Sequence, residues 1–321
     1  MTMKTLANLA GVSVSTVSKA FSGSKEISEA KREHIFKTAR ENGCFEKYCK
    51  TNFRKPVIAV ICPEFQSGYY SQHLSLLERE INKHGGLMVA SCSLFDKKKV
   101  LESLSYFTEC AKVSGAIVYF SGINKKFGVP IISVGQNDNF DSISISAKKS
   151  TYDAIKFFVD NGHKDIAFIG ENLTSSRLND FCNAMVENGV EINGDYIIKT
   201  EKRFEIAGYD AMNLLLSLPK PPTAVFAAYD NIALGAMKSI FEHGLKIPDD
   251  ISVIGIDDNQ QSSFFNVPLA SITSYNEDLC EIIVNMLFER IENGNTGKPK
   301  KVQLSTELVK RNSVGAVKNR L

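Results

Sequence analysis

The chain has 321 residues, of which 43% are hydrophobic and 23% are charged, and its formal net charge is +2. This length corresponds to two or three domains with sizeable cores. The longest apolar runs are far shorter than the ~18 residues of a membrane helix, and the N-terminus lacks a secretory signal pattern. We therefore expect a cytoplasmic protein with no membrane partner. The seven scattered cysteines contain no Cys-x-x-Cys pair, which argues against disulfides and a zinc site.

Charge is distributed unevenly along the chain. Residues 1–55 contain eleven Lys or Arg and five Glu, which gives +6, whereas the remaining residues sum to −4. A basic head on a mildly acidic body indicates a polyanionic partner for the head. A solvated basic surface would have the same composition, so the residue pattern must decide between the two interpretations.

Three short helices are predicted in this basic region, at about 4–9, 14–21 and 28–42. Gly11 suits a tight turn after the first helix, and Ser13 is a good N-cap for the second. Such helices match the helix-turn-helix arrangement, although a helical hairpin that never meets nucleic acid is an alternative.

The second helix carries the side chains that would contact DNA. In a helix-turn-helix, the first turn of this helix enters the major groove. Val14, Ser15 and Lys19 would then face bases. The short hydroxyl side chains of Thr16 and Ser18 would reach phosphate oxygens.

Residues 2–22 resemble the N-terminal signature of the LacI/GalR family of bacterial transcriptional regulators. The blocks Ala10-Gly11-Val12-Ser13 and Thr16-Val17-Ser18-Lys19 carry this resemblance. Family members usually have Arg where this chain has Lys19, which lacks the bidentate fork to guanine. The resemblance implies a DNA-binding domain at 1–45 and double-stranded operator DNA as the partner. The implied DNA-binding residues are Thr5, Ser13, Val14, Ser15, Thr16, Ser18, Lys19, Lys50 and Phe53.

The resemblance also implies a hinge or linker at residues 46–56, which forms a helix on the operator and wedges a side chain into the minor groove. The usual hinge pattern, Pro-Asn-x-x-Ala-Arg-x-Leu, is absent here. Phe53 is the candidate wedge, because phenylalanine is among the side chains that unstack base steps. A segment this short is marginal as an isolated helix, so we expect it to order only on DNA.

From residue 56 onward, short β-rich runs alternate with helical stretches. Continuous apolar strands separated by helices indicate parallel sheets covered on both faces. We expect two doubly wound units, at about 57–148 and 149–274, with a ligand site in the cleft between them. The expected strands are 57–62, 87–91, 116–120, 131–134, 166–169, 196–200, 224–227 and 252–256. The expected helices are 71–84, 98–111, 150–161, 176–188, 205–216 and 231–243.

Motifs of catalysis are missing from the sequence. It contains no Gly-x-Gly-x-x-Gly after a strand, no Walker loop, no Gly-x-Ser-x-Gly elbow and no His-Glu-x-x-His. The five histidines are isolated from one another. We therefore expect neither an enzyme nor a bound cofactor or metal.

The body resembles the same family along nearly its whole length. Landmark runs are 63–70, 162–170, 177–185, 222–237, 251–258 and 308–313. The resemblance implies the α/β fold of type I periplasmic binding proteins for a core at 57–313. It assigns 57–148 and 275–300 to an N-subdomain, 149–274 and 301–313 to a C-subdomain, and 314–321 to a tail.

Effector positions follow from the resemblance residue by residue. Arg177 stands at the family's effector arginine and Asp257 at its acidic partner; such a pair across a cleft suits a polyhydroxylated ligand, although a structural ion pair is the alternative. Gly135 stands where sugar-binding members often have Asp, and Tyr229 replaces a frequent Asn. The implied effector-binding residues are Pro63, Glu64, Tyr69, Tyr70, Gly135, Arg177, Tyr229, Asp257 and Ser274. We expect a sugar or sugar derivative that is smaller, flatter or less hydroxylated than usual.

These observations favour a ligand-responsive, sequence-specific DNA-binding regulator, a repressor of carbohydrate-related genes. One recognition helix reads about half a site, so we expect a homodimer. A periplasmic-type sugar-binding protein without DNA binding is the first alternative, and the basic head argues against it. An enzyme on a doubly wound fold is the second, and the missing motifs argue against it.

Overall fold

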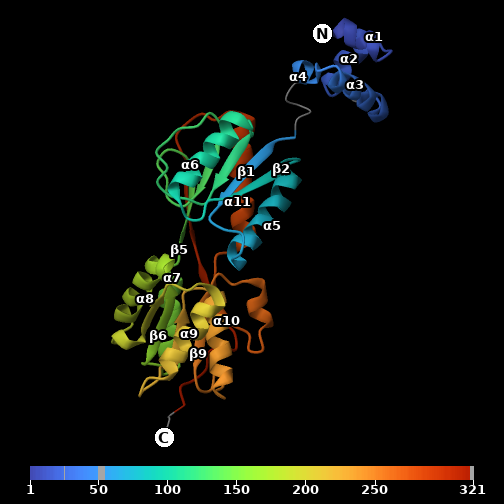
Figure 1. Cartoon of the computed structure of the whole chain (residues 1–321). Coiled ribbons are helices and arrows are strands. Elements are labelled where there is room, and N and C mark those ends of the chain that lie inside the picture. Colours follow the sequence, from blue (N-terminus) through green and yellow to red (C-terminus); the bar gives the residue numbers. More distant parts are fainter. Residues whose placement is uncertain (25, 50–54, 319–321) are drawn as a thin grey trace. The chain divides into compact units, whose positions relative to one another are not determined.

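The computed structural model describes residues 1–24, 26–49 and 55–318 (Figure 1). The chain divides into two compact units. The first, here called the head, is formed by Met1–Val57 with Gly85–Leu87, and the second, the body, contains the remaining residues.

The head contains the three predicted helices: α1 (Met3–Leu9), α2 (Val14–Phe21) and α3 (Glu29–Glu41). Gly11 makes the turn between the first two with φ of 62°, a left-handed conformation that favours glycine. Local capping explains where α2 begins, because Ser13 Oγ accepts a hydrogen bond from the Thr16 N–H at 3.1 Å. The buried core of the head includes Leu6, Val17, Phe21, Ile35 and Phe36.

A fourth short helix, α4 (Phe45–Tyr48), occupies residues that were predicted to begin the linker at 46–56. The Phe45 ring lies 5.2 Å from the Phe36 ring, and the Tyr48 hydroxyl donates to the Met1 carbonyl at 2.7 Å. Residues 46–48 are therefore part of the head, because aromatic packing on α3 continues past residue 45. Lys50 and Phe53 lie outside the described residues, and their DNA contacts stay predictions.

The body contains two six-stranded sheets. The first has the order β11-β5-β4-β3-β1-β2, and we call the half built on it the N-subdomain. Its strands are β1 (Val57–Cys62), β2 (Leu87–Cys92), β3 (Gly115–Val118), β4 (Ile131–Val134), β5 (Asp141–Ser146) and β11 (Lys301–Ser305). Its helices are α5 (Gly68–Lys83), α6 (Lys97–Ser105) and α11 (Asn276–Asn293), and α11 packs on α5 and β3.

The second sheet has the order β12-β10-β9-β8-β6-β7 and defines the C-subdomain. Its strands are β6 (Ile166–Glu171), β7 (Ile197–Thr200), β8 (Ala224–Ala227), β9 (Ser252–Ile256), β10 (Ala270–Thr273) and β12 (Glu307–Val309). Its helices are α7 (Lys148–Asp160), α8 (Ser175–Glu187), α9 (Phe204–Leu216) and α10 (Asp230–Glu242). β12 runs antiparallel to β10, whereas the other registered pairs of this sheet are parallel.

Three expectations about the body are wrong in detail. The strands β5, β10, β11 and β12 escaped the sequence analysis, because short strands with alternating polar residues resemble loops. β11 pairs with β5 in the N-subdomain sheet, with Val302 opposite Ile143, so residues 301–305 do not belong to the C-subdomain. The helix expected at 98–111 ends at Ser105 and continues as a π-helix, Tyr106–Cys110.

Helices α9 and α10 touch backbone to backbone. A Cβ atom on Gly208 would lie 1.9 Å from the Ile232 carbonyl oxygen, and one on Gly235 would lie 1.8 Å from the Glu205 carbonyl oxygen. Only glycine permits this approach at either position. The contact fixes the first turns of both helices, which follow directly on Arg203 and Tyr229.

Candidate functional site

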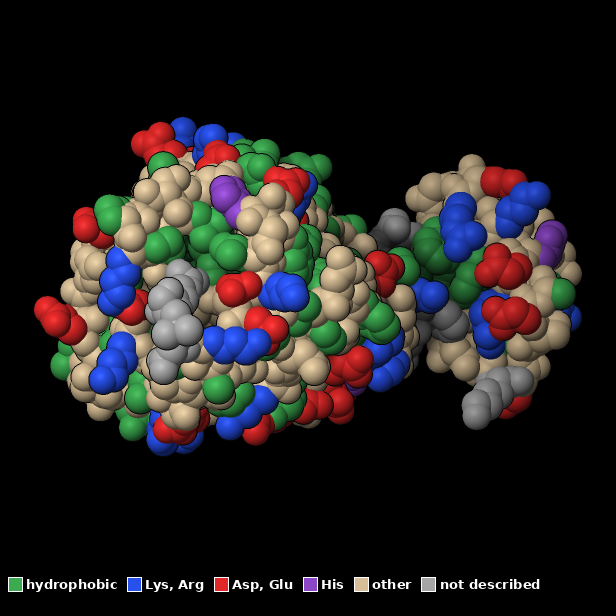
Figure 2. Space-filling view, turned by 90° about the horizontal axis from the view of Figure 1, so that it is seen from below, with side chains coloured by type: hydrophobic (Ala, Val, Ile, Leu, Met, Phe, Trp, Pro, Cys, Tyr) green, Lys and Arg blue, Asp and Glu red, His purple; other side chains and the backbone are tan. Residues whose placement is uncertain are grey.

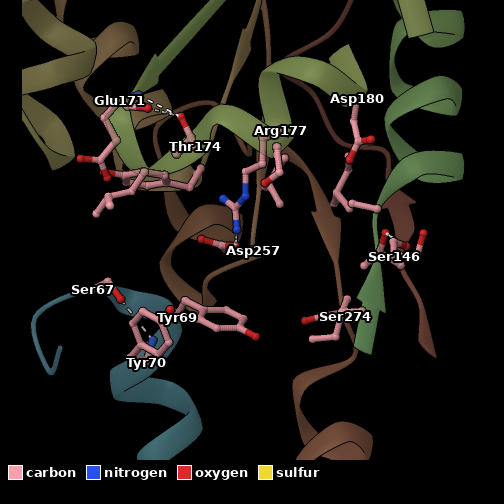
Figure 3. Close-up of a pocket in the computed structure, with 18 of the residues that line it drawn as sticks. Ser67, Tyr69, Tyr70, Ser146, Glu171, Thr174, Arg177, Asp180, Asp257 and Ser274 are labelled. Atoms are coloured by element: carbon pink, nitrogen blue, oxygen red, sulfur yellow. Dashed lines mark hydrogen bonds and ion pairs between the residues drawn. The ribbon is translucent and has the colours of Figure 1, made fainter. Parts of the chain in front are cut away.

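A cavity of about 670 Å³ opens in the body, lined by residues of both subdomains (Figure 3). This volume is within the range of small-molecule sites, about 300–1,000 Å³. Seven of the nine predicted effector residues line it: Glu64, Tyr69, Tyr70, Arg177, Tyr229, Asp257 and Ser274.

Pro63 and Gly135 are not among the described residues that line this cavity. The Pro63 carbonyl instead accepts from the Leu94 N–H at 2.8 Å, beyond the end of β2. Gly135 has φ of 130°, and a Cβ atom there would lie 2.4 Å from the Ser121 hydroxyl oxygen. A side chain at this position would be strained by the backbone conformation and would have to displace the Ser121 hydroxyl, and the neighbouring Gln136 lines the cavity instead.

Arg177 and Asp257 form an ion pair within the C-subdomain, and not across the cleft as expected. Arg177, near the start of α8, donates from Nη2 to Asp257 Oδ1 at 2.9 Å and from Nη1 to the Ala228 carbonyl. Burial raises the pKa of Asp257, and the charge of Arg177 opposes that shift. The pair is preformed, and it presents polar groups of both signs to the cavity.

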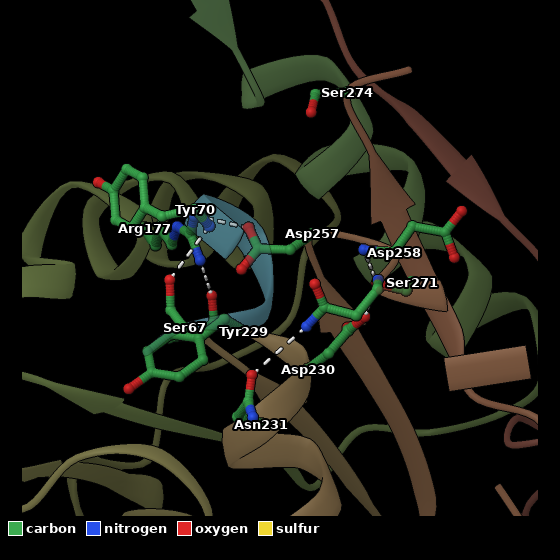
Figure 4. A network of polar contacts seen from close by, with 12 residues as sticks. Ser67, Tyr70, Arg177, Tyr229, Asp230, Asn231, Asp257, Asp258, Ser271 and Ser274 are labelled. Atoms are coloured by element: carbon green, nitrogen blue, oxygen red, sulfur yellow. Dashed lines mark hydrogen bonds and ion pairs between the residues drawn. The ribbon is translucent and has the colours of Figure 1, made fainter. Parts of the chain in front are cut away.

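The backbone that carries Asp257 is held in an uncommon conformation (Figure 4). Asp257 and Asp258 have φ of 99° and 47°. The buried carboxylate of Asp230 fixes this turn, because it accepts from the Asn259 N–H at 2.8 Å and from the Ser271 hydroxyl at 2.6 Å. Burial raises the pKa of Asp230 to about 7. The network therefore positions the acidic half of the ion pair.

Arg203, the residue before α9, bridges the two subdomains. Its Nη2 donates to Glu64 Oε1 at 3.0 Å in the N-subdomain, and its Nε donates to Glu171 Oε2 at 2.8 Å in the C-subdomain. The guanidinium carbon lies 4.6 Å from the ring centroid of Phe204 and 5.2 Å from that of Phe95. Hydrogen bonds to the two carboxylates, Glu64 first, raise the pKa of Arg203. Sequence reasoning missed Arg203, which stands in a polar loop without a motif.

Tyr229 ties this bridge to the helix that follows it. Its hydroxyl donates to Glu171 Oε1 at 2.8 Å and accepts from the Phe204 N–H at 3.0 Å. Burial raises the pKa of Tyr229, so its hydroxyl stays neutral. The side chain thus positions Glu171 and the start of α9 as well as lining the cavity.

Two adjacent tyrosines form the N-subdomain wall. Tyr69 and Tyr70 stand on the first turn of α5, where Ser67 Oγ accepts from the Tyr70 N–H at 3.2 Å (Figure 3). Their rings are 5.1 Å apart and nearly perpendicular. Burial raises the pKa of both hydroxyls, which therefore act as neutral hydrogen-bonding groups.

A buried chain of hydrogen bonds lies behind the tyrosine wall. Ser274, a lining residue, donates to Asn276 Oδ1 at 2.6 Å, and His73 Nε2 donates to the same oxygen at 2.9 Å. The Tyr119 hydroxyl lies 2.8 Å from His73 Nδ1, which is left as the acceptor. Burial lowers the pKa of His73 to about 4, so the imidazole is neutral and structural.

The head places the described candidate DNA contacts on its surface. Val14, Ser15, Ser18 and Lys19 are exposed on α2, and Lys19 forms an ion pair with Glu26. Thr5 is exposed on α1, whereas Ser13 caps α2 and Thr16 is half-buried beside it. The hydroxyls of Ser13 and Thr16 lie 2.7 Å apart. The exposed face of α2 therefore carries Val14, Ser15 and Ser18, with Lys19 in the last turn.

The described residues do not form a metal, disulfide or membrane site. Among the described residues, no group of His, Cys, Asp and Glu side chains could hold a metal ion. The seven cysteines are free thiols. No described helix is both long and apolar enough to cross a membrane.

A helix-turn-helix head and a two-sheet body with a cavity of ligand size define the class of ligand-responsive DNA-binding regulators. Residues 2–43 match the model of bacterial regulatory proteins of the lacI family, and residues 155–314 match the periplasmic binding protein-like domain. The HTH-type transcriptional repressor PurR of Histophilus somni is 31% identical, over 98% of each chain. The chain belongs to the LacI family of bacterial transcriptional regulators.

Solved structures share the fold over the full chain. The lac repressor dimer bound to operator and an anti-inducer is 23% identical, and the match covers 98% of this chain and 99% of the repressor chain with a TM-score of 0.77. The complex of the transcriptional regulator CelR with cellobiose is 23% identical with the same coverage and a TM-score of 0.67.

Proposed function

We propose that this regulator represses carbohydrate-related genes as a homodimer, and that a sugar-type effector bound in the body cavity changes its affinity for the operator. The observation that carries the proposal is the cavity wall. It combines the Arg177–Asp257 ion pair with the aromatic rings of Tyr69 and Tyr70. Charged groups that bind hydroxyls, beside rings that pack on apolar ring faces, suit a carbohydrate.

DNA binding is assigned to the head. The exposed side chains of Val14, Ser15 and Lys19 on α2 have the sizes and polarity needed for the major groove. Lys and Arg side chains lie beside Asp and Glu side chains over the face of the body seen in Figure 2. The body therefore shows mixed charge on that face, whereas residues 1–55 carry +6. Counterion release by the head would make operator affinity fall steeply as salt rises.

The effector assignment draws on the geometry and on a structural neighbour. Arg177 and Asp257 keep donors and acceptors in the cavity wall, and Ser274 adds a hydroxyl. The related CelR structure is a complex with cellobiose. We assign this chain a neutral sugar, because the two arginines that line the cavity are already paired with carboxylates, Arg177 with Asp257 and Arg203 with Glu64 and Glu171.

The switch would work through the two subdomains. Arg203 joins Glu64 to Glu171 and so links the N-subdomain to the C-subdomain beside the cavity. An effector shifts the population of subdomain arrangements only by binding one of them more tightly. A ligand that contacts Arg177 on one side and Tyr70 on the other meets this condition.

Dimer formation is assigned to the body. Phe264 is 82% exposed, the most of any large hydrophobic side chain in the described residues. A twofold partner that covers such a side chain would also supply the second recognition helix. A second copy of this chain is therefore the occupant we assign to the Phe264 surface.

Operator selection followed by sugar release tests the proposal. The protein is incubated with fragments of its own genome, and the bound fragments are sequenced. A panel of neutral mono- and oligosaccharides is then added to the complexes in a mobility-shift assay. We expect enrichment of one palindromic site near carbohydrate genes and a change in its occupancy with one class of sugar. Enrichment without any sequence preference would refute it.

A further inference from the structure

A second cavity, of about 650 Å³, lies beside the first in the body. Gln136, Ser144 and Gln303 line both cavities, so the two cavities meet at these residues. The shared side chains come from the loop after β4, from β5 and from β11. A ligand that occupies the first cavity can therefore reach the second along a common wall.

The wall of the second cavity is polar and without net charge. Ser121 contributes a hydroxyl and Asn124 contributes a carboxamide. Its charged groups among the described lining residues are Lys301 and Asp138, which form an ion pair with each other. A charged ligand would find no free counter-charge there, whereas a hydroxylated ligand finds both donors and acceptors.

Carboxamides in this wall have unused hydrogen-bonding atoms. Asn137 is 4% exposed; its Oδ1 accepts from the Asn139 N–H at 2.9 Å, but its Nδ2 is a buried donor with no partner in the described part of the chain. The side chains of Asn124, Gln136 and Gln303 are exposed, and their amides make no hydrogen bond to any described residue. An unpaired buried donor such as Asn137 Nδ2 is rare, and the three exposed amides are free to donate to and accept from a ligand.

The two cavities differ in whether aromatic side chains line them. The first cavity contains Tyr69, Tyr70 and Phe95, whereas the described lining of the second contains no aromatic ring. A flat heterocycle would find no stacking surface in the second cavity. Hydroxyl groups that hydrogen-bond to serine and amide side chains fit it better.

We infer that the effector is a neutral oligosaccharide of two or more rings, with one ring in the Arg177 cavity and the next in the second cavity. This inference rests on the proposed function and extends it, and it replaces the expectation of a ligand smaller than usual, because the two cavities adjoin. The amides of Gln136 and Gln303 face the ligand where the cavities meet, and Asn124 contacts only the distal ring. Chain length of the sugar, and not only its first ring, then determines affinity.

Calorimetry on the full-length protein tests this with α-1,4- and β-1,4-linked glucose oligomers of one to four units. We expect affinity to rise about tenfold or more with length in one of the two series. Asn124→Ala should remove part of this gain, and Asn124→Trp, which fills the cavity, should remove all of it. Both variants should bind the shortest ligand as the wild type does. The control Asn295→Ala, an exposed Asn that lines neither cavity, should keep the full gain.

Three results would overturn the inference: affinity independent of length, a length gain that survives Asn124→Trp, or no binding by any oligomer. The proposed function has a separate readout. If Arg177→Ala abolishes binding of the shortest ligand while length has no effect, the effector site stands and its extension fails. If Arg177→Ala leaves the affinity of every bound oligomer unchanged, the effector site itself is wrong.

Discussion

Arg203 and Glu64 form a two-pronged contact between the subdomains, in which both terminal nitrogens of the guanidinium donate to the two carboxylate oxygens of Glu64 at 2.5 and 3.0 Å. Bidentate pairs of this kind are among the stronger hydrogen-bonded contacts in proteins. Glu64 is 8% exposed and Glu171 is 3% exposed. Arg203 is therefore the cation that both buried carboxylates contact.

Removal of this cation should destabilise the body. For Arg203→Met we expect a loss of about 2 kcal/mol in the free energy of unfolding, below the ~3–5 kcal/mol of a fully buried pair because Arg203 is partly exposed. Urea denaturation measures the loss. Lys202→Met is the matched control, since Lys202 pairs at the surface with Asp210 and with no other carboxylate of the described residues. Equal stability of the two variants would show that the bridge contributes nothing.

Lys19 should contribute to base preference as well as to charge. Lys19→Ala is expected to weaken operator binding about tenfold or more, to relax base preference, and to lower the salt dependence by about one unit of slope per head. Fluorescence anisotropy on operator variants at several salt concentrations checks this. Lys37→Ala removes the same charge from α3. If both variants lose affinity equally on all sequences, Lys19 acts only as a charge.

His73 makes stability depend on acidity. Its pKa is lowered from 6.5 to about 4 by burial, so below pH 6.5 the unfolded chain binds a proton that the folded chain does not. Stability should therefore fall as pH falls from 6.5 to 4, by up to about 3 kcal/mol. Unfolding free energies of wild type and His73→Gln across this range isolate the effect. Parallel pH profiles would mean that His73 titrates normally.

Phe264 should lie in the contact between two copies of the chain. Phe264→Asp places a charge where we expect an apolar partner surface, and it should convert the dimer to monomer at micromolar concentration. Sedimentation velocity distinguishes the two states. Val186→Asp makes the same change at an exposed position of α8 and should leave the dimer intact. If the Phe264→Asp variant remains a dimer, the interface lies elsewhere on the chain.

Local signals account for what the sequence predicted well. Ser13 and Gly11 act within a few residues of their own positions, so the bounds of α2 followed from the sequence alone. The long apolar strands of the body were predicted from equally local sequence patterns. By contrast, β5 contains serine at every second position, 142, 144 and 146, and is completed only by pairing with β11, more than 150 residues away.

The site could be predicted only in part, because its contacts join residues that lie far apart in the sequence. Arg177 and Asp257 could be placed through the family resemblance, but their pairing within one subdomain depends on the turn that Asp230 holds. Arg203 has no sequence signal, because its role arises from carboxylates 139 and 32 residues away in the chain. Gly135 was predicted to bind the effector but does not line the cavity, because a glycine has no side chain whose direction could be inferred.

The most direct test of the account is the response of the operator complex to effector in wild type and Arg177→Ala. The variant loses one partner of a partly desolvated contact, which typically costs about 2–5 kcal/mol, or roughly 30-fold or more in affinity. Operator affinity without effector and the effector concentration needed for half-response are measured by anisotropy on the same DNA. We predict unchanged operator affinity and a response shifted at least about 30-fold or lost. An unchanged effector response in Arg177→Ala would contradict the assignment of this cavity as the effector site.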